Sequence, residues 1–131
     1  TKLATVQQAT KAAVDAINAR WSGVPASVET TQEPILQAGN KQQVLQISVA
    51  VETSTNCLHG GSAIHCGKGA PNPSKLGIEA AEMAMNSIET GACVDEFVQD
   101  QIIIFMALAQ GASSVRMGKL TPHTETALVI V

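Results

Sequence analysis

The stretch Leu45-Gln46-Ile47-Ser48-Val49-Ala50-Val51 alternates large apolar residues with small or polar ones. Successive side chains of a β-strand point to opposite faces of the sheet, so this period of two predicts a strand with one covered face. It is the clearest strand signal in the chain. The sequence on both sides of it carries helical patterns that could supply the cover.

Upstream, apolar or small residues recur at the spacing of an amphipathic helix, at Leu3, Val6, Thr10, Ala13 and Ile17. The helix is predicted to end near Trp21, because Ser22-Gly23-Val24-Pro25 contains helix breakers. Residues 24–33 alternate loosely and predict a strand, and Gly39-Asn40 predicts a turn.

Downstream, residues 57–67 predict a third strand, weakened by two adjacent glycines. The Gly- and Pro-rich segment that follows, residues 68–73, is the predicted domain boundary. Asn72 and Pro73 predict the start of a helix that Gly91 ends.

Asp95 is predicted to cap a further helix that runs to Gln110 and stops at Gly111. Its middle, residues 102–108, is apolar all round and is therefore predicted to be buried on most sides. Residues 113–118 and 124–131 predict two strands around a turn. The whole pattern predicts an α+β fold in which helices pack on one face of mixed or antiparallel sheets.

Composition excludes several classes of protein. The net charge of −3 argues against a stand-alone nucleic-acid binder, and no apolar run in the sequence is long enough to cross a bilayer, so no membrane partner is predicted. The three cysteines are odd in number and contain no CxxC pair, which favours an intracellular protein without a disulfide framework. Charged residues make up only 15% of the chain, which suggests an apolar face covered by a partner.

His123, in Thr121-Pro122-His123-Thr124, is a candidate nucleophile, because a neutral imidazole attacks readily near pH 7. The local residues alone favour an ordinary loop histidine. Phe97, Asp100 and Gln101 share a helical face, where an aromatic ring beside a carboxylate and an amide could bind a purine. The alternative is a capping run followed by a core aromatic.

Four possible zinc ligands lie within ten residues, in Cys57-Leu58-His59 and His65-Cys66. Their spacing matches no zinc finger or ribbon. His65 and Cys66 would also point to opposite faces of a strand. A metal-free strand is therefore predicted, and no metal ligands are assigned.

Two stretches carry a resemblance to a known family: Gly91-Ala92-Cys93-Val94-Asp95-Glu96-Phe97-Val98-Gln99-Asp100-Gln101-Ile102-Ile103-Ile104-Phe105-Met106-Ala107-Leu108-Ala109 and Leu120-Thr121-Pro122-His123-Thr124-Glu125-Thr126-Ala127. The first closely resembles the long helix of the RNA 3′-terminal phosphate cyclases in their eukaryotic form. The second resembles the loop that bears the family's nucleophilic histidine. Residues 52–57 and 75–82 fit the same family in the same order.

The resemblance implies a large domain of repeats, each with two helices on a four-stranded sheet, like the C-terminal domain of translation initiation factor three. A smaller α/β domain is inserted into the last repeat. On that basis residues 1–67 are most of the inserted domain, and residues 68–131 are the closing half of the last repeat. The apparent start and stop of the chain predict a fragment of a longer protein.

The resemblance also implies an ATP-dependent, ligase-type reaction that converts an RNA 3′-phosphate into a 2′,3′-cyclic phosphate through a histidine–AMP intermediate. It implies that His123 is the adenylylated nucleophile, that Asp100 and Gln101 line the nucleotide site, and that Phe97 lies beside the adenine. The family often has tyrosine at the position of Phe97, which puts one hydrogen bond in doubt. ATP and a divalent cation, Mg²⁺ or Mn²⁺, are the implied cofactors, and the implied location is the nucleoplasm rather than the cytoplasm.

The family's N-terminal repeats, which supply acidic and arginine residues to the ATP site, are absent from these residues. The isolated chain is therefore expected to bind no ATP or cation and to be inactive. Exposed apolar surface predicts that it forms a homo-oligomer. Two alternatives stay open: a non-catalytic cyclase-like protein of ribosome assembly, which would lack the histidine, and a self-associating structural module.

Overall fold

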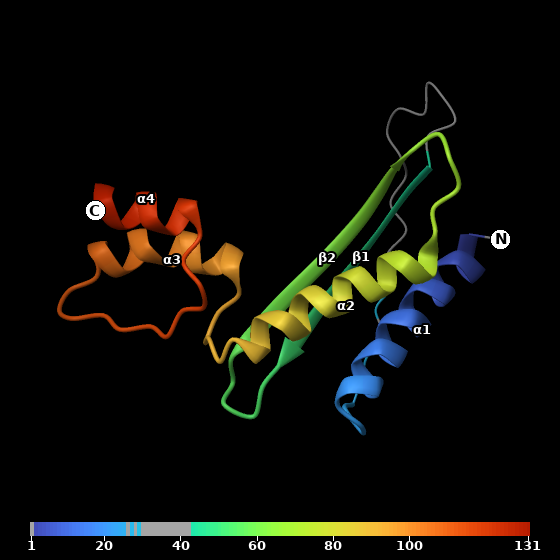
Figure 1. Cartoon of the computed structure of the whole chain (residues 1–131), viewed down its shortest axis with the longest axis horizontal. Helices are drawn as coiled ribbons and strands as arrows, with labels where there is room; N and C mark the ends of the chain where they lie inside the picture. Colours follow the sequence, from blue (N-terminus) through green and yellow to red (C-terminus); the bar gives the residue numbers. More distant parts are fainter. Residues whose placement is uncertain (1, 26, 28, 30–42) are drawn as a thin grey trace. The chain divides into compact units, whose positions relative to one another are not determined.

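The computed structural model of the 131-residue chain describes residues 2–25, 27, 29 and 43–131. Its helices and strands follow one another as shown in Figure 1: α1 (Lys2–Arg20), β1 (Gln43–Glu52), β2 (Leu58–Gly67), α2 (Pro73–Glu89), α3 (Glu96–Leu108) and α4 (Pro122–Ile130). The α+β class is confirmed. The predicted turn at Gly39-Asn40 and much of the predicted strand over 24–33 lie outside the described residues.

The strand signal at 45–51 is confirmed, because these residues form the middle of β1, which pairs with β2 in a two-stranded sheet. Along β1 the odd-numbered residues from Leu45 to Val51 are half-buried and those between them are exposed. One face of the ribbon is therefore covered, as the alternation predicted.

The described chain divides into two compact units. One is built from Thr1–Val49 and Gly61–Met83, and the other from Ala50–Gly60 and Ala84–Val131. The strands and α2 contribute residues to both units.

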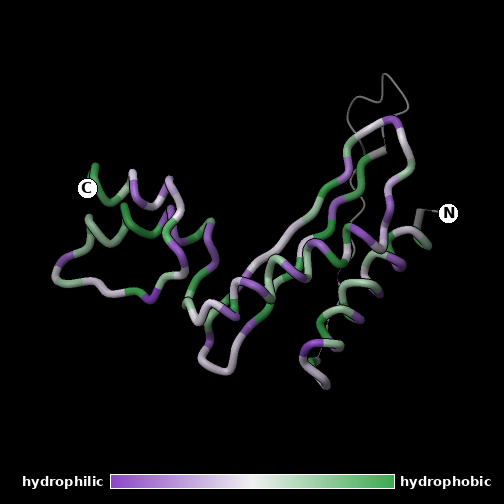
Figure 2. The backbone as a smooth tube through the Cα atoms, viewed as in Figure 1, coloured by the Kyte–Doolittle hydropathy of each residue, from purple (hydrophilic) through white to green (hydrophobic). Residues whose placement is uncertain are grey.

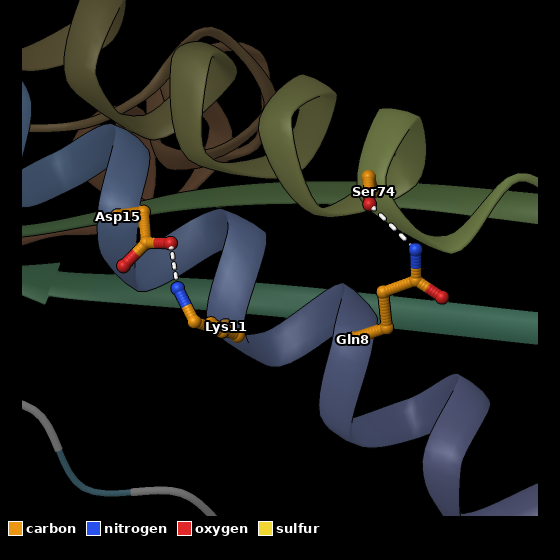
Figure 3. A network of polar contacts seen from close by, with 4 residues as sticks. All are labelled: Gln8, Lys11, Asp15 and Ser74. Carbon is orange, nitrogen blue, oxygen red and sulfur yellow. Dashed lines mark hydrogen bonds and ion pairs between the residues drawn. The ribbon is translucent and has the colours of Figure 1, made fainter.

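In the first unit, α1 and α2 approach so closely that no side chain fits at Gly77. A Cβ atom there would lie 2.1 Å from the backbone oxygen of Ala9. Small buried side chains, among them Ala9, Ala13 and Ala80, make this approach possible. The Gln8 amide nitrogen also donates to the Ser74 hydroxyl at 3.1 Å, which joins the two helices at the surface (Figure 3).

Both ends of α2 follow the predicted signals. The Asn72 side-chain oxygen accepts from the Lys75 N–H at 3.1 Å, which satisfies one of the free donors of the first turn. After the helix, Gly91 has φ +71° and its N–H donates to the Ile88 carbonyl at 2.9 Å. This left-handed conformation suits glycine and ends the helix.

The two predicted C-terminal strands are wrong. Residues 122–130 form the helix α4, because Thr121 caps it by accepting from the Thr124 N–H at 3.0 Å and because Pro122 occupies its first turn. Residues 113–118 form no strand. The Arg116 carbonyl accepts from the N–H of Cys93, in the loop before α3, at 2.8 Å. The Gly118 N–H donates to the side-chain oxygen of Gln99 at 3.1 Å.

The predicted burial of the middle of α3 is also wrong. Ile103 is buried, but Phe105 is 70% exposed and Leu108 is 78% exposed. Within this chain α3 packs on α4, and that contact covers one side of a helix that is apolar all round. The remaining apolar surface faces solvent.

The helices described by the structure include none that is long and apolar enough to cross a membrane.

Candidate active site

The start of α3 is fixed by Asp95. One carboxylate oxygen accepts from the N–H groups of Phe97 and Val98 at 3.0 and 2.9 Å, so the predicted cap is confirmed. The other oxygen accepts from the Gly60 N–H at 3.1 Å. A single side chain therefore caps the first turn and ties it to the start of β2.

A buried amide connects α3 to the segment before His123. Gln99 is 1% exposed, and its side-chain nitrogen donates to the Lys119 carbonyl at 3.1 Å and to the Thr124 hydroxyl at 2.9 Å. Its side-chain oxygen accepts from the Gly118 N–H at 3.1 Å. Both donor hydrogens and the acceptor of this amide are used, so Gln99 holds the backbone on one side of His123 and a side chain on the other.

Asp100 completes the arrangement. Its Oδ1 accepts from the hydroxyl of Thr121 at 2.7 Å and from the hydroxyl of Thr124. The Thr124 hydroxyl holds the pKa of the Asp100 carboxyl below its ordinary value, the Thr121 hydroxyl acts in the same direction, and so does the charge of His123. Asp100 is therefore an anion at neutral pH, close enough to His123 for their charges to interact.

His123 lies in the first turn of α4, between Pro122 and the fully buried Thr124, and its own side chain is exposed. Because Thr121 and Thr124 are both tied to α3, the backbone of His123 is held on both sides while the imidazole faces solvent. The N-terminus of a helix favours anions through its free N–H groups and its dipole. An imidazole presented here could attack a phosphate.

The other predicted binding residues all lie on α3. Phe97 is 54% exposed, so the alternative of a core aromatic is wrong, and Gln101 is exposed as well. The structure brings Asp100 together with the turn that bears His123. It leaves the side chains of Phe97 and Gln101 facing solvent beside it on the helix.

Sequence reasoning missed Gln99, Thr121 and Thr124, which hold the site together. A signal for Gln99 existed: it lies four residues before the buried Ile103 and four after the buried Asp95, on the inner face of α3. A polar residue on the buried stripe of an apolar helix needs a hydrogen-bonding partner. Thr121 followed by Pro122 is likewise a signal for the start of a helix. The aliphatic residues that follow led instead to the prediction of a strand.

The four residues considered as zinc ligands have separate surroundings. His59 is buried and its Nδ1 lies 2.8 Å from the Ser87 hydroxyl, whereas His65 Nε2 lies 2.9 Å from the Gly69 carbonyl. Cys57 is half-buried and Cys66 is exposed. Within the part of the chain that the structure describes, no three His, Cys, Asp or Glu side chains gather as a metal site would require.

Comparison with known proteins gives one family. Residues 3–131 match the sequence model of the family described as RNA 3′-terminal phosphate cyclase. A Drosophila melanogaster protein of that name is 43% identical over 82 residues, which are 63% of this chain and 22% of the relative. Proteins of the same name from Pyrococcus furiosus and Methanothermobacter thermautotrophicus are 32% and 41% identical over 110 and 68 residues.

These alignments cover 83% and 52% of this chain and 29% and 20% of the archaeal relatives. The chain thus spans less than a third of the length of each of these three relatives. The family match itself extends over nearly all of its residues. The chain belongs to the RNA 3′-terminal phosphate cyclase family.

Proposed function

We propose that these residues form the nucleophile-bearing part of an ATP-dependent RNA 3′-phosphate cyclase. The observation that carries the proposal is His123, exposed at the start of α4 and held on both sides by the bonds of Thr121 and Thr124 to α3. This arrangement occurs in a member of the cyclase family. The presence of the histidine argues against a non-catalytic cyclase-like protein.

In the proposed reaction a ring nitrogen of His123 attacks the α-phosphorus of ATP, and pyrophosphate leaves. The imidazole loses its proton from the other nitrogen and holds AMP through a P–N bond. An oxygen of the RNA 3′-phosphate then attacks the same phosphorus and takes the AMP. The neighbouring 2′-hydroxyl closes the cyclic phosphate, releases AMP and gives up its proton.

The roles of the remaining residues follow from their places. Phe97 offers an exposed ring on which the adenine can stack, and Gln101 offers an exposed amide near it. Asp100 is a positioning residue, since the oxygen that accepts from Thr121 and Thr124 orients the turn that bears His123. The first turn of α4 adds a positive dipole end close to the phosphate.

A divalent cation, Mg²⁺ or Mn²⁺, would need ligands from the substrate in order to bind at this site. Asp100 is the sole carboxylate assigned to it, and the described residues contain no cluster of three ligands. Mg²⁺ is commonly held by one or two carboxylates together with phosphate oxygens. The cation would therefore arrive on the triphosphate and offset its charge.

The isolated chain is proposed to be inactive. Pentacovalent phosphorus needs donors that stabilise its charge. The relatives are more than three times as long as the parts that align with this chain, so further donors can come from the rest of such a protein. The test is a chimera in which this chain replaces the aligned segment of the Drosophila relative. We expect the chimera to convert a 3′-phosphorylated oligoribonucleotide into a phosphatase-resistant 2′,3′-cyclic product only when ATP is present, and the isolated chain to convert none. A folded chimera that leaves the 3′-phosphate untouched, beside an active Drosophila protein, contradicts the proposal.

We further propose that the isolated chain self-associates through the apolar surface of α3 and α4. Hydrophobic residues make up the C-terminal halves of both helices (Figure 2), and Phe105, Leu108 and Val129 are at least 70% exposed. The same surface contains an open hollow, which is lined by Ile103, Met106, Ala107, Ser113, Met117, Leu128 and Val131. Contiguous apolar surface of this kind marks an interface.

Light scattering at moderate concentration is expected to give a mass of at least twice 13.6 kDa. The variant Leu108→Lys should shift the mass towards the monomer, because it places a charge in the apolar surface. Glu82→Lys on α2, also an exposed site, serves as a control that should leave it unchanged. A monomeric wild-type chain contradicts self-association.

A further inference from the structure

The segment that leads to His123 carries the only arginine and the only lysine of its compact unit. That unit consists of Ala50–Gly60 and Ala84–Val131, and acidic residues in it outnumber the two cations, Arg116 and Lys119. Both side chains are exposed. Within the described residues neither of them forms an ion pair or a side-chain hydrogen bond. Their charges are therefore available to a bound anion.

The backbone at both residues is held in place. The Arg116 carbonyl accepts from the Cys93 N–H at 2.8 Å, and the Lys119 carbonyl accepts from the Gln99 side-chain nitrogen at 3.1 Å. The Arg116 guanidinium lies next to Gly91, since a Cβ atom there would be 3.6 Å from one of its nitrogens. Each side chain thus projects from a fixed point of the backbone, which lowers the entropy cost of meeting a ligand.

Lys119 also lies close to the residue that carries the proposed nucleophile. The Gln99 side-chain nitrogen donates both to the Lys119 carbonyl at 3.1 Å and to the Thr124 hydroxyl at 2.9 Å, so these two oxygens lie within a few ångströms of each other. Thr124 directly follows His123. Arg116 precedes Lys119 by three residues, which places their Cα atoms at most about 11 Å apart. An anion that reaches His123 along this segment therefore passes both cations.

A chain of phosphates suits this pair of cations better than a single phosphate does. Lysine and arginine bind the backbone phosphates of nucleic acids directly and release the counterions that surrounded them. The triphosphate of ATP differs, because the divalent cation that accompanies it already offsets its charge. Since the acidic residues elsewhere in the unit repel RNA, the segment before His123 is the place in this unit where an RNA backbone can bind.

We propose that Lys119 and Arg116 contact backbone phosphates of the single-stranded RNA whose 3′-phosphate reacts at His123. This inference rests on the proposed cyclase function and adds to it the residues that hold the RNA. Contacts to phosphates set the register of a nucleic acid without reading its bases. Binding through these two residues is therefore expected to be independent of the RNA sequence.

The test measures the binding of a 5′-fluorescein oligouridylate with a 3′-phosphate to the chimera, by fluorescence anisotropy over a range of salt concentrations. Lys119→Gln and Arg116→Gln each remove one charge. Each is expected to lower the affinity about fivefold at ~0.1 M salt and to reduce the slope of log affinity against log salt by about 0.7, the value for one phosphate contact of a single strand. Lys119→Arg should retain the affinity, and a 3′-phosphorylated oligoadenylate should give the same losses.

Lys11→Gln is the matched control. It removes the same charge from α1, where Lys11 pairs with Asp15 in the other unit. This variant should change the RNA affinity by less than about twofold, because salt screens charges that do not touch the ligand. All of the substituted side chains are exposed, so the circular dichroism of each variant should match that of the unmodified chimera.

Unchanged affinity and slope in either of Lys119→Gln and Arg116→Gln would overturn the inference, and so would an equal loss in Lys11→Gln, which would reduce the effect to net charge. Lost affinity for Mg²⁺–ATP with unchanged affinity for RNA would assign the two cations to the nucleotide and overturn it as well.

Binding needs no chemistry, so the same measurement separates this inference from the proposed function. A chimera whose RNA affinity depends on Lys119 and Arg116 but which forms no cyclic product contradicts the function and supports the inference. A folded chimera that binds no RNA contradicts both.

Discussion

Replacing His123 by alanine in the chimeric cyclase is expected to lower AMP transfer from ATP to the protein by ~10³-fold or more. The imidazole supplies the atom that forms the P–N bond, so nothing in the variant can accept the AMP at this place. The measurement is acid-labile, alkali-stable radiolabel on the protein after incubation with α-labelled ATP. Mapping the label to the peptide that contains residue 123 would assign the nucleophile directly.

His65 offers a matched control for this experiment. It is also a histidine with a side chain partly open to solvent, but it lies on β2 and its ring contacts the Gly69 carbonyl. His65→Ala should keep the label within about twofold of the unmodified chimera. Equal labelling of the His123→Ala protein, or loss of label in both variants, would contradict the role assigned to His123.

Replacing Gln99 by methionine is expected to destabilise the folded chain by about 3 kcal/mol. Methionine has similar length and a similar helix propensity, so the change removes the hydrogen bonds and little else. The Lys119 carbonyl, the Gly118 N–H and the Thr124 hydroxyl all lose their bonds with the Gln99 amide. Burying a polar group without a partner costs about 1–3 kcal/mol.

Gln101 is the matched control, because it is the same residue type on the same helix but is exposed. Gln101→Met should change the free energy of unfolding by less than about 0.5 kcal/mol. Urea unfolding followed by circular dichroism at equal protein concentration compares the two variants. If both variants lose a similar free energy of unfolding, the buried hydrogen bonds of Gln99 stabilise the fold no more than an exposed amide does.

Gln99→Met should also affect the chimera in a distinctive way. Its amide holds the turn before His123 and does not touch the substrate in the proposed reaction. We therefore expect labelling to slow with a smaller change in the ATP concentration needed for half-maximal rate, since the nucleophile is misplaced while Phe97 and Gln101 are intact. An unchanged rate in a folded protein would show that the network stabilises the fold without orienting His123.

Local signals in the sequence were enough to determine most of the elements. The alternation at 45–51 predicts β1 because a strand exposes every second side chain to the same face. Asn72, Gly91 and Asp95 predict the ends of α2 and the start of α3 because their bonds and backbone angles involve neighbours in the chain. The family resemblance likewise singled out His123, whose place in a short motif needs no tertiary information.

Only tertiary structure decided the form of the C-terminal residues and the way His123 is held. Residues 124–131 are rich in aliphatic side chains and suit a strand by propensity, but a strand needs a neighbouring strand. Here Thr121 caps a helix that packs on α3, and Gln99 and Asp100 reach across to Thr124 from about 25 residues earlier in the chain. Hydrogen bonds between residues so far apart leave no periodic trace in the sequence, so the spacing of Gln99 on α3 could point to a buried amide but not to its partners Lys119, Gly118 and Thr124.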